Sequence, residues 1–115
     1  MKEKIFINAH IIDPSQKIDE KGCLILDQNG KVKAIGKNVK KSDAGSSAEI
    51  FDIKGNVLIP GIVDMKAFVG EPGYEYKENF RTLSQAALAG GVTSIVTMPN
   101  TKPIIDNVSM VDFII

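Results

Sequence analysis

The residues with the most evident chemical potential are an acid and a base two positions apart, Asp64 and Lys66. They lie in the apolar run 62–69, which is predicted to be a strand. Because side chains alternate between the two faces of a strand, Asp64, Lys66 and Phe68 are expected to share one face. The opposite face would be wholly apolar and suited to packing beneath helices. An acid, a base and an aromatic ring together are not needed by an ordinary core face, so this face is the first candidate site.

Residues that commonly bind metals or act as nucleophiles are scarce. His10 is the only histidine and Cys23 the only cysteine, so no zinc cluster of the usual kind can be built from these residues. His10 is interpreted as a surface or turn residue. Ser84 and Ser94 have no histidine beside them in the sequence, which leaves nucleophilic catalysis without support. A single cysteine excludes an internal disulfide and fits a reducing cytoplasm.

The composition is that of an ordinary soluble globular protein. Hydrophobic residues make up 43% and charged residues 24% of the 115 residues, and the formal net charge is zero. This balance gives no sign of a nucleic-acid partner or of an attraction to membrane surfaces. No apolar run approaches the roughly 20 residues that span a bilayer. We therefore expect neither nucleic acid nor membrane as a partner.

The first half of the chain is predicted to be a small all-β unit. Asn29-Gly30 between two apolar runs is a strong hairpin signal, and Asp13-Pro14 marks a turn. Strands are expected at residues 4–8, 22–27, 32–35 and 49–53, with a polar surface loop at 40–48.

From Val57 onward the pattern changes to strand, helix, strand, helix. The first helix is predicted because Phe80, Leu83 and Ala87 fall on one helical face. Gly90-Gly91 can end that helix. A strand connected to the next strand through a helix makes a right-handed crossover and a parallel sheet. The expected elements are a strand at 62–69, a helix at 77–89, a β-branched strand at 92–98 and a helix from 108 onward.

Two loops carry a resemblance to a known family. An apolar run, Pro60-Gly61, two residues and Asp64, followed by Glu-Pro-Gly at 71–73, resembles the first barrel strand of the amidohydrolase superfamily. Residues 71–78 and the Met-Pro-Asn-Thr run at 98–101 are most similar to dihydroorotases. The dihydropyrimidinase branch shares the architecture but resembles these loops less well.

The resemblance implies a fold class: α/β with an N-terminal all-β portion. The composite would join a small β-sandwich portion at residues 1–55 to the start of a metal-dependent-hydrolase TIM (β/α)8 barrel. Residues 56–115 would supply the first two β/α units. A complete barrel takes roughly 250 residues, so the chain is expected to be a fragment of a longer protein.

The sequence departs from the family at the residues that carry its chemistry. In the family the aspartate is followed by His-x-His-x-Arg, whose histidines bind catalytic zinc and whose arginine holds the substrate carboxylate. Lys66, Phe68 and Gly70 occupy these three positions here. We therefore predict no metal ligand, no catalytic residue and no cofactor in this chain, although the family uses zinc. Lys66 either pairs with Asp64 or a later carboxylate while Phe68 fills the volume of the ion, or it simply reaches solvent.

Asn100 is the one candidate substrate-binding residue. The resemblance implies that the corresponding asparagine of dihydroorotases contacts the substrate, which makes Asn100 a vestigial binding residue. Pro99-Asn100 is also a plain turn signal after a strand. Tyr74 and Tyr76 flank the first loop and are interpreted as lid or surface packing.

Three functions follow from these observations. The first is a noncatalytic dihydroorotase-like protein, linked to pyrimidine biosynthesis, that supports aspartate carbamoyltransferase. The second is an active dihydroorotase or cyclic amidohydrolase that uses ligands from chain beyond residue 115. The third is a non-hydrolytic module that binds a small molecule. We favour the first, in a cytoplasmic protein that forms homo- or hetero-oligomers, and leave open whether the protein is an enzyme.

Overall fold

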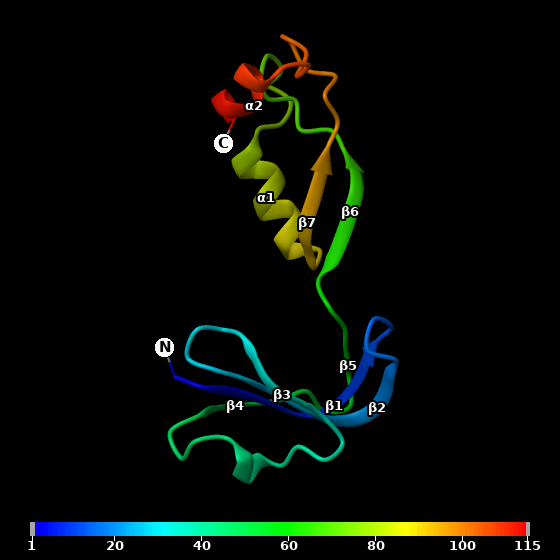
Figure 1. The fold of residues 1–115 in the computed structure, drawn as a ribbon, viewed down its shortest axis with the longest axis vertical. Helices are drawn as coiled ribbons and strands as arrows, with labels where there is room; N and C mark the ends of the chain where they lie inside the picture. Colours follow the sequence, from blue (N-terminus) through cyan, green and yellow to red (C-terminus); the bar gives the residue numbers. More distant parts are fainter. Residues whose placement is uncertain (1, 115) are drawn as a thin grey trace. The chain divides into compact units, whose positions relative to one another are not determined.

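The computed structural model describes residues 2–114, which fall into two compact units that divide between Pro60 and Gly61 (Figure 1). The division lies a few residues beyond the predicted boundary at residue 55. The reason is a short strand, β5 (Val57–Leu58), which pairs with the first strand of the chain and so belongs to the first unit. No helix in the described range is long and apolar enough to span a bilayer.

The first unit is a five-stranded mixed sheet. Its other strands are β1 (Lys4–Asp13), β2 (Ile18–Leu26), β3 (Val32–Gly36) and β4 (Glu49–Asp52), in the order β3-β2-β1-β4. β1 is antiparallel to β2, and β2 to β3, whereas β4 and β5 both run parallel to β1. The loop before β4, predicted to be irregular, contains one 3-10 turn at Lys41–Asp43.

β1 continues well past Asn8, where the sequence predicts its end. The pairing with β2 shifts register between Phe6 and Ala9, and Asn8 takes a positive φ of 57°. Asparagine tolerates this left-handed conformation better than most residues. Its side-chain amide donates to Asp52 Oδ1 at 2.9 Å. A bulge at Asn8 therefore redirects the strand without ending it.

The predicted hairpin between β2 and β3 is confirmed. Gly30 has a φ of +79°, a conformation that glycine adopts without steric cost. The Asp27 carboxylate accepts hydrogen bonds from the backbone N–H groups of Asn29 and Lys31 at 2.8 and 2.9 Å. These bonds satisfy backbone donors that the tight loop would otherwise leave unpaired.

The core of this unit is a small set of aliphatic side chains on β1 and β2: Ile5, Ala9, Ile11 and Ile25. Ile5 and Ile25 lie opposite each other in register, and neither is exposed. Burying one such side chain stabilises a fold by about 1.5 to 3 kcal/mol. On neighbouring positions of β1 and β4, the rings of Phe6 and Phe51 stack with centroids 5.0 Å apart. The unit is thus held by apolar contacts across its central strands.

The second unit has the predicted strand, helix, strand, helix order. β6 (Ile62–Ala67) and β7 (Val92–Thr97) form a two-stranded parallel sheet, as predicted. α1 (Phe80–Ala89) connects them and lies alongside β7, and α2 (Val108–Ile114) follows (Figure 1).

α1 begins at Phe80, three residues later than predicted. Asn79 is extended and caps the helix, since its Oδ1 accepts the backbone N–H of Thr82 at 3.0 Å. The helix ends at Ala89 with Gly90 as its C-cap, and Gly91 follows with a φ of +80°, in agreement with the predicted glycine stop. The cap, rather than the apolar periodicity, fixes where the helix starts.

Candidate functional site

The candidate site is formed by the two loops that follow β6 and β7. The carboxyl ends of parallel strands meet at one edge of a sheet, which is where α/β folds place their ligands. Two backbone hydrogen bonds join this edge: Met98 N–H donates to the carbonyl of Ala67 at 2.8 Å, and Lys102 N–H to that of Pro72 at 3.0 Å. The buried residues of the second unit gather here, namely Val69, Gly70, Pro72 and Thr101. The loop edge is therefore the best-packed part of this unit.

β6 carries a bulge between Asp64 and Ala67. Asp64 pairs with Ile95 and Ala67 with Thr97. The two residues of β6 are three positions apart, whereas their partners in β7 are only two apart, so β6 contains one extra residue. Asp64 Oδ1 accepts the backbone N–H of Lys66 at 2.9 Å, so the carboxylate satisfies a donor at the irregularity. The strict alternation predicted for the strand is therefore interrupted before Phe68, which lies just beyond the end of β6.

The Lys66 side chain is exposed. Within residues 2–114 its ammonium forms no ion pair, and its link to Asp64 runs through the backbone N–H alone. Among the described residues the Lys66 side chain thus reaches solvent. A replacement of the charge of a metal ion by a Lys66–Asp64 ion pair is not seen among the described residues.

Phe68 belongs to an aromatic cluster that also contains Tyr74 and Tyr76. The ring centroids of Phe68 and Tyr74 lie 6.3 Å apart, and those of the two tyrosines 6.5 Å apart. Both separations are within the range of favourable ring pairs. The Lys77 ammonium stands 5.2 Å from the centroid of Tyr74 and 5.6 Å from that of Tyr76, a cation–π arrangement. Tyr74 thus lies between Phe68 and Tyr76, and Tyr76 itself is largely exposed.

Gly70 is buried and takes a φ of +75°. A Cβ atom at this position would lie 2.8 Å from the carbonyl oxygen of Glu78 and 3.0 Å from that of Tyr74. Both neighbours are backbone atoms, which cannot swing aside as a flexible side chain can. The position is therefore shaped for a residue without a side chain.

Glu71 has a structural role that was not predicted from the sequence. Its Oε2 accepts the backbone N–H of Phe80 at 2.9 Å and so ties the loop to the first turn of α1. The first N–H groups of a helix have no intrahelical partner, and a carboxylate there is favoured by the helix dipole. The sequence did contain a signal for this contact, namely an acidic residue a few positions before the predicted start of the helix.

Glu75 holds the next turn of the same loop. The backbone N–H of Gly73 donates to Glu75 Oε1 at 2.8 Å and lowers the pKa of this carboxyl below its ordinary value. A hydrogen bond to the charged form favours that form. The ionised carboxylate is therefore part of the loop's structure.

Asn100 is exposed in the loop after β7, at the same edge of the sheet as Phe68. The neighbouring Thr101 is only 4% exposed, and its hydroxyl donates to the carbonyl of Pro103 at 2.8 Å. Thr101 was not singled out as a site residue, and its type alone gave no signal of burial. It anchors the turn from which Asn100 projects.

The residue types at this edge do not fit the zinc that the sequence resemblance implies. Zinc takes nitrogen, sulfur or oxygen donors, and Phe68 has none. Asp64, Glu71 and Glu75 each accept a backbone N–H. In the range 2–114, no three His, Cys, Asp or Glu side chains lie close enough to hold a metal ion together. His10, in the first unit, lies with Nε2 2.6 Å from Asp19 Oδ1.

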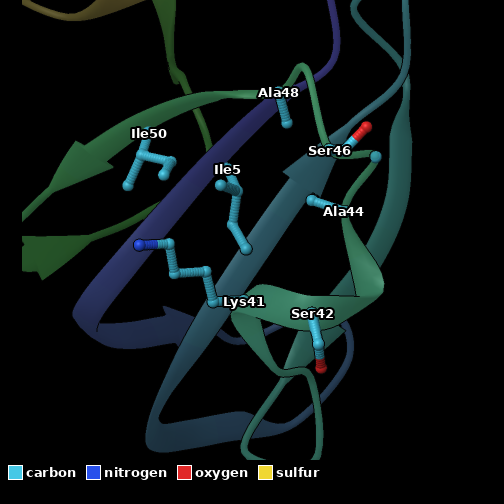
Figure 2. Close-up of a pocket in the computed structure, with 8 residues that line it drawn as sticks. Ile5, Lys41, Ser42, Ala44, Ser46, Ala48 and Ile50 are labelled. Atoms are coloured by element: carbon cyan, nitrogen blue, oxygen red, sulfur yellow. The ribbon is translucent and has the colours of Figure 1, made fainter.

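The first unit contains an open cavity of about 530 Å³ between β1, β4 and the loop that precedes β4 (Figure 2). In Figure 2 the hydroxyls of Ser42 and Ser46 point away from Ile5, and the amine of Lys41 is the only side-chain polar group that extends past Ile5. Ligand sites combine apolar walls with a few polar groups that converge on the ligand. This cavity lacks such convergence. Its lining residues are Ile5, Lys41, Ser42, Ala44, Gly45, Ser46, Ala48 and Ile50.

Comparison with known proteins points to one family. Residues 55–114 match the family described as dihydro-orotase-like. The chain is 48% identical over 107 residues to the dihydroorotase of Geobacter metallireducens, covering 93% of this chain and 24% of that protein. It is 41% identical over 115 residues to the dihydroorotase of Aquifex aeolicus, covering 100% of this chain and 26% of that protein. It thus spans about a quarter of the length of these curated relatives.

Among solved structures, the chain is similar to the L-hydantoinase (dihydropyrimidinase) from Arthrobacter aurescens. The TM-score is 0.78 at 28% sequence identity, and the match covers 96% of this chain and 23% of the hydantoinase. This likeness confirms the predicted fold class, in which a β-sandwich portion precedes the start of an α/β barrel.

Proposed function

Because this chain belongs to the dihydroorotase-like family, we propose that it is part of a noncatalytic member of that family. In this proposal the protein is linked to pyrimidine biosynthesis and supports aspartate carbamoyltransferase. The observation that carries the noncatalytic part is the set of residues at the end of β6, where Lys66, Phe68 and Gly70 stand in the frame of the family's metal and substrate residues. The frame itself, Glu-Pro-Gly at 71–73 and Met-Pro-Asn-Thr at 98–101, is retained.

The chemistry of a zinc hydrolase explains why these replacements matter. A catalytic zinc lowers the pKa of its bound water to about 7 and polarises the carbonyl under attack. Phe68 offers no lone pair, and its ring packs beside Tyr74. Lys66 could act as a ligand only as a free amine, and a lysine gives up its proton near neutral pH only at a large cost. Gly70 supplies no guanidinium to hold a carboxylate.

The proposal includes a complete barrel in the whole protein, with residues 56–115 as its first two β/α units. Strands of such a barrel are covered on both faces, by the barrel interior and by the outer helices. Within this chain the side chains of Val63 and Met65 on β6 remain 54% and 71% exposed. Further barrel strands and helices would cover them. We place the protein in the cytoplasm, where the thiol of Cys23 stays reduced.

The partner proposal rests on analogy with dihydroorotase-like proteins that assemble with aspartate carbamoyltransferase. Its test is co-purification of the untagged transferase with the whole protein from its native cell, followed by sizing of the complex. Repeated purification of the dihydroorotase-like protein without the transferase, under conditions that preserve other assemblies, would remove this part of the proposal.

An active dihydroorotase is the second candidate, and the identity to proteins named dihydroorotase favours it. In that case the ligands must come from chain outside these residues. Asn100 would then bind substrate rather than be vestigial.

Metal content and activity of the whole protein, measured together, separate the two candidates. The noncatalytic protein should contain well under one equivalent of zinc per chain and should neither form nor hydrolyse dihydroorotate. The active enzyme should contain about one equivalent or more, and a chelator should remove metal and activity together. An Asn100→Ala variant sharpens the distinction, because it should lower activity only if Asn100 contacts substrate.

A further inference from the structure

We propose that Gly70 closes residues 70–78 into a fixed cap over the end of β6, and that the closed cap admits no side chain at position 70. This inference concerns the shape of the loop and goes beyond the proposed function. Only its consequence for a carboxylate ligand rests on that function.

The first observation is the return of the loop onto Gly70. Tyr74 N–H donates to the carbonyl of Gly70 at 2.6 Å, and the N–H groups of Lys77 and Glu78 donate to the carbonyl of Tyr74 at 2.8 and 3.4 Å. These bonds bring the carbonyls of Tyr74 and Glu78 over the α-carbon of Gly70. The space in which a Cβ atom would stand is therefore occupied by backbone of the same loop.

The second observation is that the cap also contacts α1 and the loop after β7. Glu71 ties it to the N–H of Phe80 in α1. Gly73 has a φ of +98°, and a Cβ there would collide with the carbonyl of Lys102. The same neighbour donates its N–H to Pro72 at 3.0 Å. The cap cannot shift away from Gly70 without breaking contacts with both α1 and the loop after β7.

The closed cap seats Tyr74 beside Phe68. The backbone N–H of Tyr74 donates to Gly70, and its carbonyl accepts from Lys77. Because both bonds hold the backbone of Tyr74, closure of the loop at Gly70 fixes where the Tyr74 ring lies. The Lys77 ammonium is in turn held over the faces of both tyrosine rings. The closed cap thus places an aromatic ring beside Phe68, with the Lys77 ammonium over that ring.

This arrangement has a consequence for specificity. An arginine at position 70 could not stand in the closed cap, because even the first carbon of its side chain meets two backbone carbonyls. The site therefore selects against ligands that need a cation at this position to hold a carboxylate. Gly70 acts by positioning the loop and touches no reacting atom.

The chain offers a direct optical test. Tyr74 and Tyr76 are its only tyrosines, and it has no tryptophan, so the tyrosine band of near-ultraviolet circular dichroism reports on the cap alone. Gly70→Ala in the 115-residue chain should lose most of this band. Gly91→Ala is the matched control, since Gly91 has a similar φ of +80° but nothing within 4 Å of an added Cβ. It should keep the band.

Each outcome bears on the proposal. Retention of the band in Gly70→Ala, or an equal loss in both variants, would overturn it, because the contact with the carbonyls would then not matter. Unfolding of Gly70→Ala alone, seen in far-ultraviolet spectra, would support it, since Gly91→Ala carries a similar backbone strain without the contact with the carbonyls.

A second pair of variants tests the cap without touching its backbone. Phe68→Leu should shift the tyrosine band, whereas Phe113→Leu, on the exposed face of α2, should leave it unchanged. An unchanged band in Phe68→Leu would contradict the seating of Tyr74. None of these measurements uses zinc or turnover, so the proposed function and this inference can fail separately.

Discussion

The carboxylate of Asp64 accepts a hydrogen bond from the backbone N–H of Lys66 at 2.9 Å, at the bulge of β6. Asp64 and Lys66 are therefore joined by a hydrogen bond to the backbone of Lys66, and not by an ion pair with its ammonium. Loss of this acceptor leaves a backbone donor to solvent. Asp64→Ala should lower the free energy of unfolding by about 0.5 to 1.5 kcal/mol.

Urea unfolding followed by circular dichroism measures this effect, and Asp64→Asn should recover much of it, because the amide oxygen can still accept. Lys66→Ala is the control. Its side chain is exposed, so the change should stay within about 0.5 kcal/mol. A larger effect for Lys66→Ala than for Asp64→Ala would show that the ammonium, not the N–H, is the important group.

Glu71 should act as a helix cap supplied from the preceding loop. Glu71→Ala removes the acceptor of the Phe80 N–H and should cost about 1 kcal/mol of unfolding free energy. Glu71→Gln keeps an oxygen acceptor but loses the favourable charge at the helix N-terminus, so it should cost about half as much. Equal stability of the wild type and Glu71→Ala in urea unfolding would refute this role.

The loop should respond to acid through Glu75. The N–H of Gly73 holds the pKa of this carboxyl below its ordinary value in the folded chain. Such a group contributes stability above its unfolded pKa of about 4.3, and the contribution is lost as the pH falls through the lower folded value. The tyrosine band should therefore stay constant from neutral pH down to the ordinary glutamate pKa and weaken only below it.

Glu75→Gln provides the comparison for this titration. The amide cannot ionise, so the part of the acid transition that belongs to Glu75 should disappear from the tyrosine signal. If the wild type and Glu75→Gln show the same pH profile, another carboxyl controls the loop.

Restoring the missing histidines should not restore catalysis. In the whole protein, the double substitution Lys66→His and Phe68→His supplies two imidazoles, but position 70 still lacks the arginine that the family uses. Turnover of dihydroorotate should remain at the level of the unsubstituted protein, whether or not zinc content rises. Measured turnover that rises with bound zinc in the double variant would show that these two positions alone set the activity.

The sequence predicts those parts of the fold that depend on local pattern. β-branched runs and glycine or proline stops place β7 and the end of α1 within a residue or two, and the Asn29-Gly30 signal places the β2–β3 hairpin. The register irregularities of the two sheets, among them the bulges at Asn8 and after Asp64, were not predicted. A bulge depends on the register of the partner strand, which a single strand's sequence does not contain.

For the site, too, the sequence predicted the side-chain chemistry but not the backbone geometry. Residue types were enough to identify Phe68 as unable to bind a metal, because that conclusion needs only the chemistry of the side chain. The closure of the loop over Gly70 required the positions of two carbonyls four and eight residues further along the chain. The cap made by Glu71 required knowing that α1 begins at Phe80.

The pairing of β1 also constrains the order in which the first unit can be completed during synthesis. β1 and β2 are neighbours in the chain and can pair as soon as both have emerged from the ribosome. The other side of β1 waits for β4 and β5, which lie far along the chain and pair with it in parallel. Until residues 49–58 emerge, β1 is an edge strand with one row of unpaired backbone groups, open to pairing with a neighbouring nascent chain.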